Sequence, residues 1–133
     1  MAKIWPAING LIASKSAITA ELGSPPRLNP NRLKQGNTTF PAGYYRTVSI
    51  QGTPTFEGAS KHDFNRVDFF FYANSLSKLE SLAKIFRENI EDSIGTYNGI
   101  EITSVRFMDA GTDWADELEK HTIQMEFFIS SRR

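Results

Sequence analysis

The chain has 133 residues, of which 40% are hydrophobic and 23% are charged, and its formal net charge at pH 7 is zero. These values are typical of a globular domain, so we expect a single domain over residues 1–133 that needs no metal or disulfide to fold. The absence of cysteine excludes disulfides, thiolate metal sites and a cysteine nucleophile. The N-terminus lacks the apolar core of a signal peptide, and no run reaches the roughly 18 apolar residues of a membrane span. We therefore expect a protein of the cytoplasm, or of a particle assembled there, with no membrane partner.

The charges are distributed unevenly along the chain. Residues 1–66 contain eight Lys/Arg and three Asp/Glu, a net charge of +5, whereas residues 67–133 contain seven Lys/Arg and twelve Asp/Glu, a net charge of −5. Two interpretations remain open. The division is either chance along a folded chain or the mark of polar subunits that associate head to tail.

The first predicted element is one helix over residues 4–22. Pro6 suits its first turn, where the missing N–H costs nothing. The apolar residues on one helical face are Ile4, Ile8, Leu11, Ile18 and Leu22. Residues 24–41 then predict an extended loop with four prolines, in which every charge is positive, from Arg27, Arg32 and Lys34. A structureless loop of this length in a compact domain is often functional.

Two strands are predicted next, at 43–51 and 65–73, joined by a polar segment over 52–62 that is either a long connection or a mobile hairpin tip. In the second strand, Val67, Phe69 and Phe71 alternate with Asp68, Phe70 and Tyr72. Both faces of this strand are therefore partly apolar. Since a sheet covered on one side should have one polar face, another element or another subunit is expected to cover the second face.

The second helix is predicted to begin with a capping box formed by Ser77 and Glu80 and to end at Gly95. Its apolar residues are Leu79, Leu82, Phe86, Ile90 and Ile94. A turn at Asn98-Gly99 leads to strands at 100–107 and 122–129, separated by a loop over 108–119. The resulting order is α-β-β-α-β-β. It predicts an α+β fold, in which an antiparallel sheet of about four strands carries two helices on one face.

Few residues suggest chemistry. His62 and His121 have no partner at metal-ligand spacing, and no phosphate loop, HExxH or GxSxG motif occurs. The loop 108–119 is acidic, with Asp109, Asp113, Asp116, Glu117 and Glu119, but it lacks the alternating ligands and the central glycine of a calcium loop. Trp114 within it suggests an anchored loop. A solvated loop, a subunit interface and a metal-dependent catalytic site all remain possible. The zero net charge and the lack of a basic helix disfavour nucleic-acid binding by the basic loop.

Four segments resemble a known family. They are residues 40–49 (FPAGYYRTVS), 66–73 (RVDFFFYA), 75–83 (SLSKLESLA) and 107–111 (FMDAG). In this order, and with a leading helix and a final hydrophobic strand, they resemble the tail-completion or tail-terminator proteins of long-tailed bacteriophages, over about residues 8–130.

This resemblance implies a virion protein without catalysis, cofactor or metal. Such proteins form a ring, usually a hexamer, on the head-proximal end of the tail tube. The ring stops tube polymerisation and docks the head, so the implied partners are further copies of the chain, the tail tube protein and a head completion or stopper protein. DNA passes through the lumen without specific binding.

Ten residues are expected at subunit or tail interfaces. They are Arg27, Arg32, Lys34, Phe70, Tyr72, Asp109, Asp113, Trp114, Asp116 and Glu117. The alternative within structural proteins is another head–tail connector component, an adaptor or stopper. Outside that class, the alternatives are a small metal-dependent enzyme and a cytoplasmic module that binds a small molecule.

Overall fold

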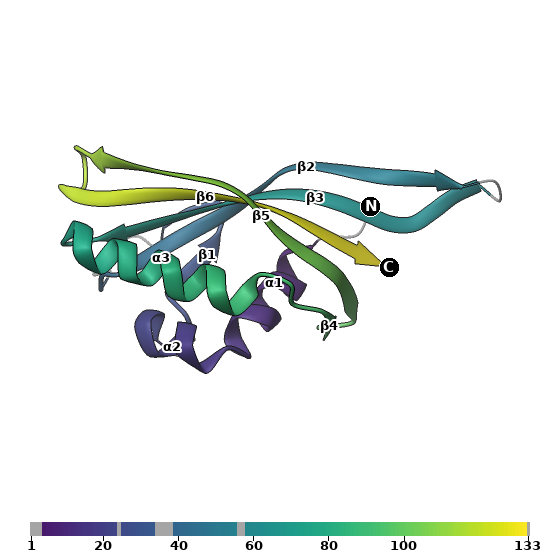
Figure 1. The fold of residues 1–133 in the computed structure, drawn as a ribbon, viewed down its shortest axis with the longest axis horizontal. Coiled ribbons are helices and arrows are strands. Elements are labelled where there is room, and N and C mark those ends of the chain that lie inside the picture. Colours follow the sequence, from purple (N-terminus) through teal and green to yellow (C-terminus); the bar gives the residue numbers. More distant parts are fainter. Residues whose placement is uncertain (1–3, 24, 34–38, 56–57, 133) are drawn as a thin grey trace.

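The computed structural model describes residues 4–23, 25–33, 39–55 and 58–132. In this part of the chain, three helices lie on one face of a strongly curled, six-stranded sheet (Figure 1). We call the opposite face, over which no described helix lies, the helix-free face. The predicted α+β class is confirmed, whereas two helices and about four strands were too few.

The sheet has the strand order β1-β2-β3-β6-β5-β4. The strands are β1 (Leu28–Pro30), β2 (Ala42–Thr55), β3 (Gly58–Ala73), β4 (Gly95–Tyr97), β5 (Ile100–Ala115) and β6 (Lys120–Arg132). All neighbours are antiparallel except β1 and β2, so the sheet is mixed and not purely antiparallel as predicted. The short β1 lies in the predicted loop 24–41. It was missed because three residues carry no recognisable alternation, and only pairing with β2 makes them a strand.

The predicted first helix is two helices, α1 (Trp5–Ala13) and α2 (Ser16–Leu22). The Ser14 hydroxyl donates to the carbonyl oxygen of Leu11 at 2.6 Å, and Lys15 takes an extended conformation, which ends the first helix. The apolar residues on both sides of this break are nevertheless buried, so the predicted stripe is right. No described helix is long and apolar enough to cross a membrane.

The third helix, α3 (Leu76–Ile90), begins two residues before the predicted capping box. Its N-cap is Ser75, whose side chain accepts a hydrogen bond from the backbone N–H of Lys78 at 3.2 Å. The helix ends at Ile90, so the predicted end at Gly95 is wrong. Ile94 is 71% exposed, whereas the other four predicted core residues of the stripe are buried.

The predicted connection or hairpin tip over 52–62 and the predicted loop 108–119 are mostly strand, and the pairing of β2 with β3 makes the first of them a hairpin. β2 continues to Thr55 and β3 starts at Gly58, and in Figure 1 this hairpin projects well beyond the helices. Likewise β5 continues to Ala115, past a bulge at Met108. The part of β5 from Met108 to Trp114 is exposed, so its side chains need no apolar alternation, and backbone pairing with β6 defines it as a strand.

The core lies between the sheet and the helices and is built on phenylalanine. The ring of Phe86 on α3 lies 4.8 Å from those of Phe69 and Phe71 and 6.0 Å from that of Phe127, between ring centroids. These spacings are typical of favourable tilted and edge-to-face aromatic pairs. The predicted turn at Asn98-Gly99 is confirmed, with positive φ at both residues.

Candidate functional site

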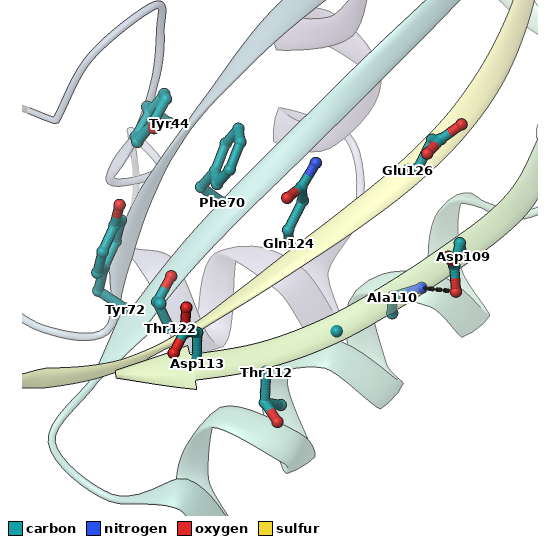
Figure 2. Close-up of a pocket in the computed structure, with 11 residues that line it drawn as sticks. Tyr44, Phe70, Tyr72, Asp109, Ala110, Thr112, Asp113, Thr122, Gln124 and Glu126 are labelled. Atoms are coloured by element: carbon teal, nitrogen blue, oxygen red, sulfur yellow. Dashed lines mark hydrogen bonds between the residues drawn. The ribbon is translucent and has the colours of Figure 1, made fainter. Parts of the chain in front are cut away.

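A groove crosses the helix-free face of the sheet, from β2 over β3 and β6 to β5 (Figure 2). We call it the aromatic–acidic groove. Its volume is about 490 Å³. It is lined by Tyr44, Phe70, Tyr72, Asp109, Ala110, Gly111, Thr112, Asp113, Thr122, Gln124 and Glu126.

The sheet register brings these side chains together. Along the groove, Tyr44 of β2 pairs with Phe70 of β3, Phe70 pairs with Gln124 of β6, and Gln124 pairs with Gly111 of β5. Because neighbouring strands lie about 4.8 Å apart, these four positions form one row across the sheet. Tyr72, Thr122 and Asp113 form the adjacent row in the same way.

One wall of the groove is aromatic. The rings of Tyr44 and Phe70 are stacked, with centroids 4.7 Å apart and planes 12° apart, and Tyr72 stacks beside Tyr44 at 6.3 Å. The guanidinium carbon of Arg46 lies 5.5 Å from the centroid of the Phe70 ring. This wall therefore already holds one arginine head group at its margin.

The opposite wall is acidic. The carboxylate oxygen Oδ1 of Asp109 accepts a hydrogen bond from the N–H of Ala110, and Oδ1 of Asp113 accepts one from the N–H of Trp114, both at 2.8 Å. Neither carboxylate forms an ion pair with another described residue. Glu126 differs, because its Oε1 lies 3.0 Å from Nε of Arg66 on β3. Asp109 and Asp113 thus leave negative charge exposed along β5.

The floor of the groove is open at Gly111. A Cβ atom added to this residue would meet no atom within 4 Å. On the aromatic wall, burial raises the pKa of the Tyr72 hydroxyl to about 12, with a further contribution from Tyr44. The Tyr72 hydroxyl is therefore neutral at physiological pH and can both donate and accept a hydrogen bond.

The groove unites four of the predicted interface residues: Phe70, Tyr72, Asp109 and Asp113. Trp114, Asp116 and Glu117 do not line it. Trp114 was expected to anchor a loop, but it is 47% exposed and packs edge-on against His121, with ring centroids 4.9 Å apart. Asp116 and Glu117 are exposed in the turn between β5 and β6.

The predicted basic residues have different settings. Arg27 is directed inward, where its Nε donates to the carbonyl oxygen of Pro41 at 3.1 Å and its Nη2 to that of Glu21 at 3.2 Å. Arg32 is exposed just after β1, at the sheet edge opposite β5. Lys34 lies outside the described residues.

Seven lining residues were not predicted from the sequence: Tyr44, Ala110, Gly111, Thr112, Thr122, Gln124 and Glu126. Strand alternation carried a usable signal for the three on β6, because Thr122, Gln124 and Glu126 alternate with the buried Ile123, Met125 and Phe127. Their position beside β3 depended on strand order, which alternation does not reveal.

The structure separates the acids that could have held a metal ion. Asp109 and Asp113 lie four residues apart on one strand, about 13 Å at 3.3 Å per residue, which is too far for both to bind one ion. Within the described residues, no three His, Asp or Glu side chains come together at a possible metal site.

The fold is similar to that of one chain of a solved virion. No protein-family model matches the sequence, and no curated protein matches it significantly. The structure is similar to a chain of the "Virion of native gene transfer agent (GTA) particle", with a TM-score of 0.77 and 8% sequence identity, over 96% of this chain and 92% of that one. The chain therefore shares the complete fold of a protein that is part of that virion.

Proposed function

We propose that this chain is a structural protein of a phage-like virion and that its role is not catalytic. The observation that carries the proposal is the fold match, which extends over nearly the full length of both chains. The resemblance of the sequence to bacteriophage tail-terminator proteins independently supports a virion structural protein, since it depends on local sequence motifs and not on the fold.

Within this class, we propose that the chain is a tail terminator. Copies of it form a ring, with six subunits as the working number, on the head-proximal end of a tail tube. The ring stops tube polymerisation and presents a surface to the head completion or stopper protein, while DNA passes through its lumen without specific binding. It would be assembled in the host cytoplasm and remain in the virion at the head–tail interface.

Two structural features support a ring-forming subunit. The helices cover one face of the sheet only, so the helix-free face with its aromatic–acidic groove is available for another protein (Figure 1). The acidic residues of the groove lie near the β5 edge of the sheet, whereas Arg32 lies at the β1 edge. Complementary groups on opposite edges suit head-to-tail contacts, which close into rings.

The alternative is another connector component, an adaptor or stopper at the same junction. Deleting the gene in a particle-producing host and imaging the particles by electron microscopy separates the two. Overlong tails are expected for a missing terminator. Tails of normal length beside heads that have lost their DNA would contradict the terminator role and favour a stopper.

A second experiment tests ring formation directly. Native mass spectrometry of the purified protein, alone and with isolated tail tubes, is expected to detect a closed oligomer in at least one of the two conditions. A chain that remains monomeric in both conditions would contradict the terminator proposal.

A further inference from the structure

We propose that the aromatic–acidic groove is a receptor site for an arginine side chain, and that its occupant is Arg32 of a second copy of this chain. This inference rests on the proposed ring and specifies one of its contacts. It identifies a binding site whose lining comes from four strands that are distant in sequence.

The chemistry of the groove selects a guanidinium group. A guanidinium stacks on aromatic faces and forms paired hydrogen bonds with a carboxylate. The groove offers the ring of Tyr72 and the margin of the stacked Tyr44–Phe70 pair and, two strands away, the carboxylate of Asp113, one oxygen of which accepts no hydrogen bond from a described residue. Since strands lie about 4.8 Å apart, this separation is about 10 Å, which leaves room for a side chain to lie between the two walls.

The floor of the groove suits a long side chain as well. Gly111 contributes no side chain, and the space above it is open. Gln124 and Thr122 lie between the two walls and supply polar groups along the floor. The aliphatic part of an arginine can therefore rest against the aromatic rings while its head group reaches Asp113.

Arg32 is selected among the arginines that lie away from the acidic strand. Arg106 is also exposed and forms no ion pair with a described residue, but it lies on β5 with the acids themselves. Residues 1–66 contain four arginines. Arg27 donates to two backbone carbonyl oxygens. Arg46 lies over Phe70 of its own subunit, and Arg66 is paired with Glu126. Arg32 is exposed and forms no ion pair with a described residue. Its guanidinium is therefore the one among these four that remains available to a neighbour.

The topology makes the contact heterologous, so it can repeat around a ring. The acids are on β5, next to one edge of the sheet, and Arg32 follows β1, which forms the other edge. Each subunit thus offers an arginine on one side and a receptor groove on the other. When such a contact repeats head to tail, the interface is heterologous, the type that closes into a ring.

The test uses five variants of the full-length chain, one of which is a control. Arg32→Asp and Asp113→Arg each remove the attraction, and the double variant restores it with the charges exchanged. Gly111→Leu places an apolar side chain in the groove at a position where a Cβ atom meets no neighbour within 4 Å. Glu80→Gln, at an exposed position on α3, is the matched control for loss of one acidic charge. Thermal unfolding confirms that each variant folds.

The measured quantity is the subunit dissociation constant of the oligomer, from native mass spectrometry and light scattering over a dilution series. Each charge variant and Gly111→Leu are expected to raise it at least about tenfold, and Glu80→Gln to leave it unchanged. The double variant is expected to recover most of the loss, as a double-mutant cycle requires of a direct pair. The wild-type constant should also rise with added salt.

Several results would overturn the contact. A wild-type oligomer that all three single variants leave intact would refute the groove as a subunit contact while leaving the proposed ring standing. Failure of the double variant to recover affinity would refute Arg32 as the occupant. A monomeric wild-type chain, also on tail tubes, would refute both the contact and the terminator role.

Discussion

The hydroxyl of Tyr45 on β2 donates to Oδ1 of Asn9 on α1 at 2.5 Å and lies 3.2 Å from the carbonyl oxygen of Trp5. Tyr45 is 1% exposed, so this polar group joins the sheet to the first helix inside the core. Replacing Tyr45 with Phe is expected to lower the free energy of unfolding by about 0.5–1.5 kcal/mol, because the partly buried Oδ1 of Asn9 loses its donor. Urea denaturation checks this. Tyr97→Phe is the control, since the Tyr97 hydroxyl makes no hydrogen bond that the described structure shows, and equal losses in both variants would contradict the prediction.

The buried tyrosines also predict how stability depends on alkaline pH. Burial raises the pKa of Tyr45 far above its ordinary value of 10.0 and that of Tyr72 to about 12. In both cases the native state favours the neutral hydroxyl. The resulting stabilisation is therefore complete below pH 10.0 and is lost as the pH rises from there towards the folded-state pKa. The urea midpoint of the wild type is expected to fall above about pH 10, and less steeply in Tyr45→Phe. Identical pH profiles of the two proteins would show that Tyr45 does not contribute.

The start of α3 distinguishes two serines that look equivalent in sequence. Ser75 caps the helix through the N–H of Lys78, whereas Ser77 is exposed within the first turn. Ser75→Ala is expected to destabilise the protein by about 1 kcal/mol. Ser77→Ala is expected to change the stability by less than about 0.5 kcal/mol. Thermal unfolding of both variants checks this. A larger loss of stability in Ser77→Ala than in Ser75→Ala would contradict the prediction and support the capping box predicted from the sequence.

Substitution by alanine is expected to affect stability at one glycine of the sheet and not at another. At Gly43, an added Cβ would lie 2.2 Å from the backbone carbonyl oxygen of Phe70, which cannot move without disturbing β3. Gly43→Ala is therefore expected to cost about 1–3 kcal/mol or more. Gly111→Ala meets no atom within 4 Å and should leave the stability almost unchanged. Equal melting temperatures for the two variants would contradict the close approach at Gly43.

Side-chain periodicity predicted the elements that pack against the core. The faces of β3 and β6 and the buried residues of α3 follow from alternation and from the helical period, because burial of apolar groups is what those patterns record. The same signal failed at Ile94, which continues the helical spacing but lies beyond the end of α3 and is 71% exposed. It also failed at β1, which has only three residues, and in β5 from Met108 to Trp114, where the side chains are exposed and backbone pairing defines the strand.

The candidate site was likewise predictable from the sequence only in part. From the sequence, Phe70, Tyr72, Asp109 and Asp113 were expected at an interface, because aromatic residues on a second strand face and acids outside the core need a partner or solvent. Their union in one groove with Tyr44 and Gly111 depended on the order of β2, β3, β6 and β5.

By itself, then, the sequence determined the α+β class, the apolar faces of the long elements and the exclusion of cysteine chemistry, since each depends on composition or local period. Only the tertiary structure decided the mixed topology, the inward direction of Arg27 and the position of Arg32 opposite the groove. Strand pairing joins residues that are far apart in the chain, and neither composition nor local period records which strands become neighbours.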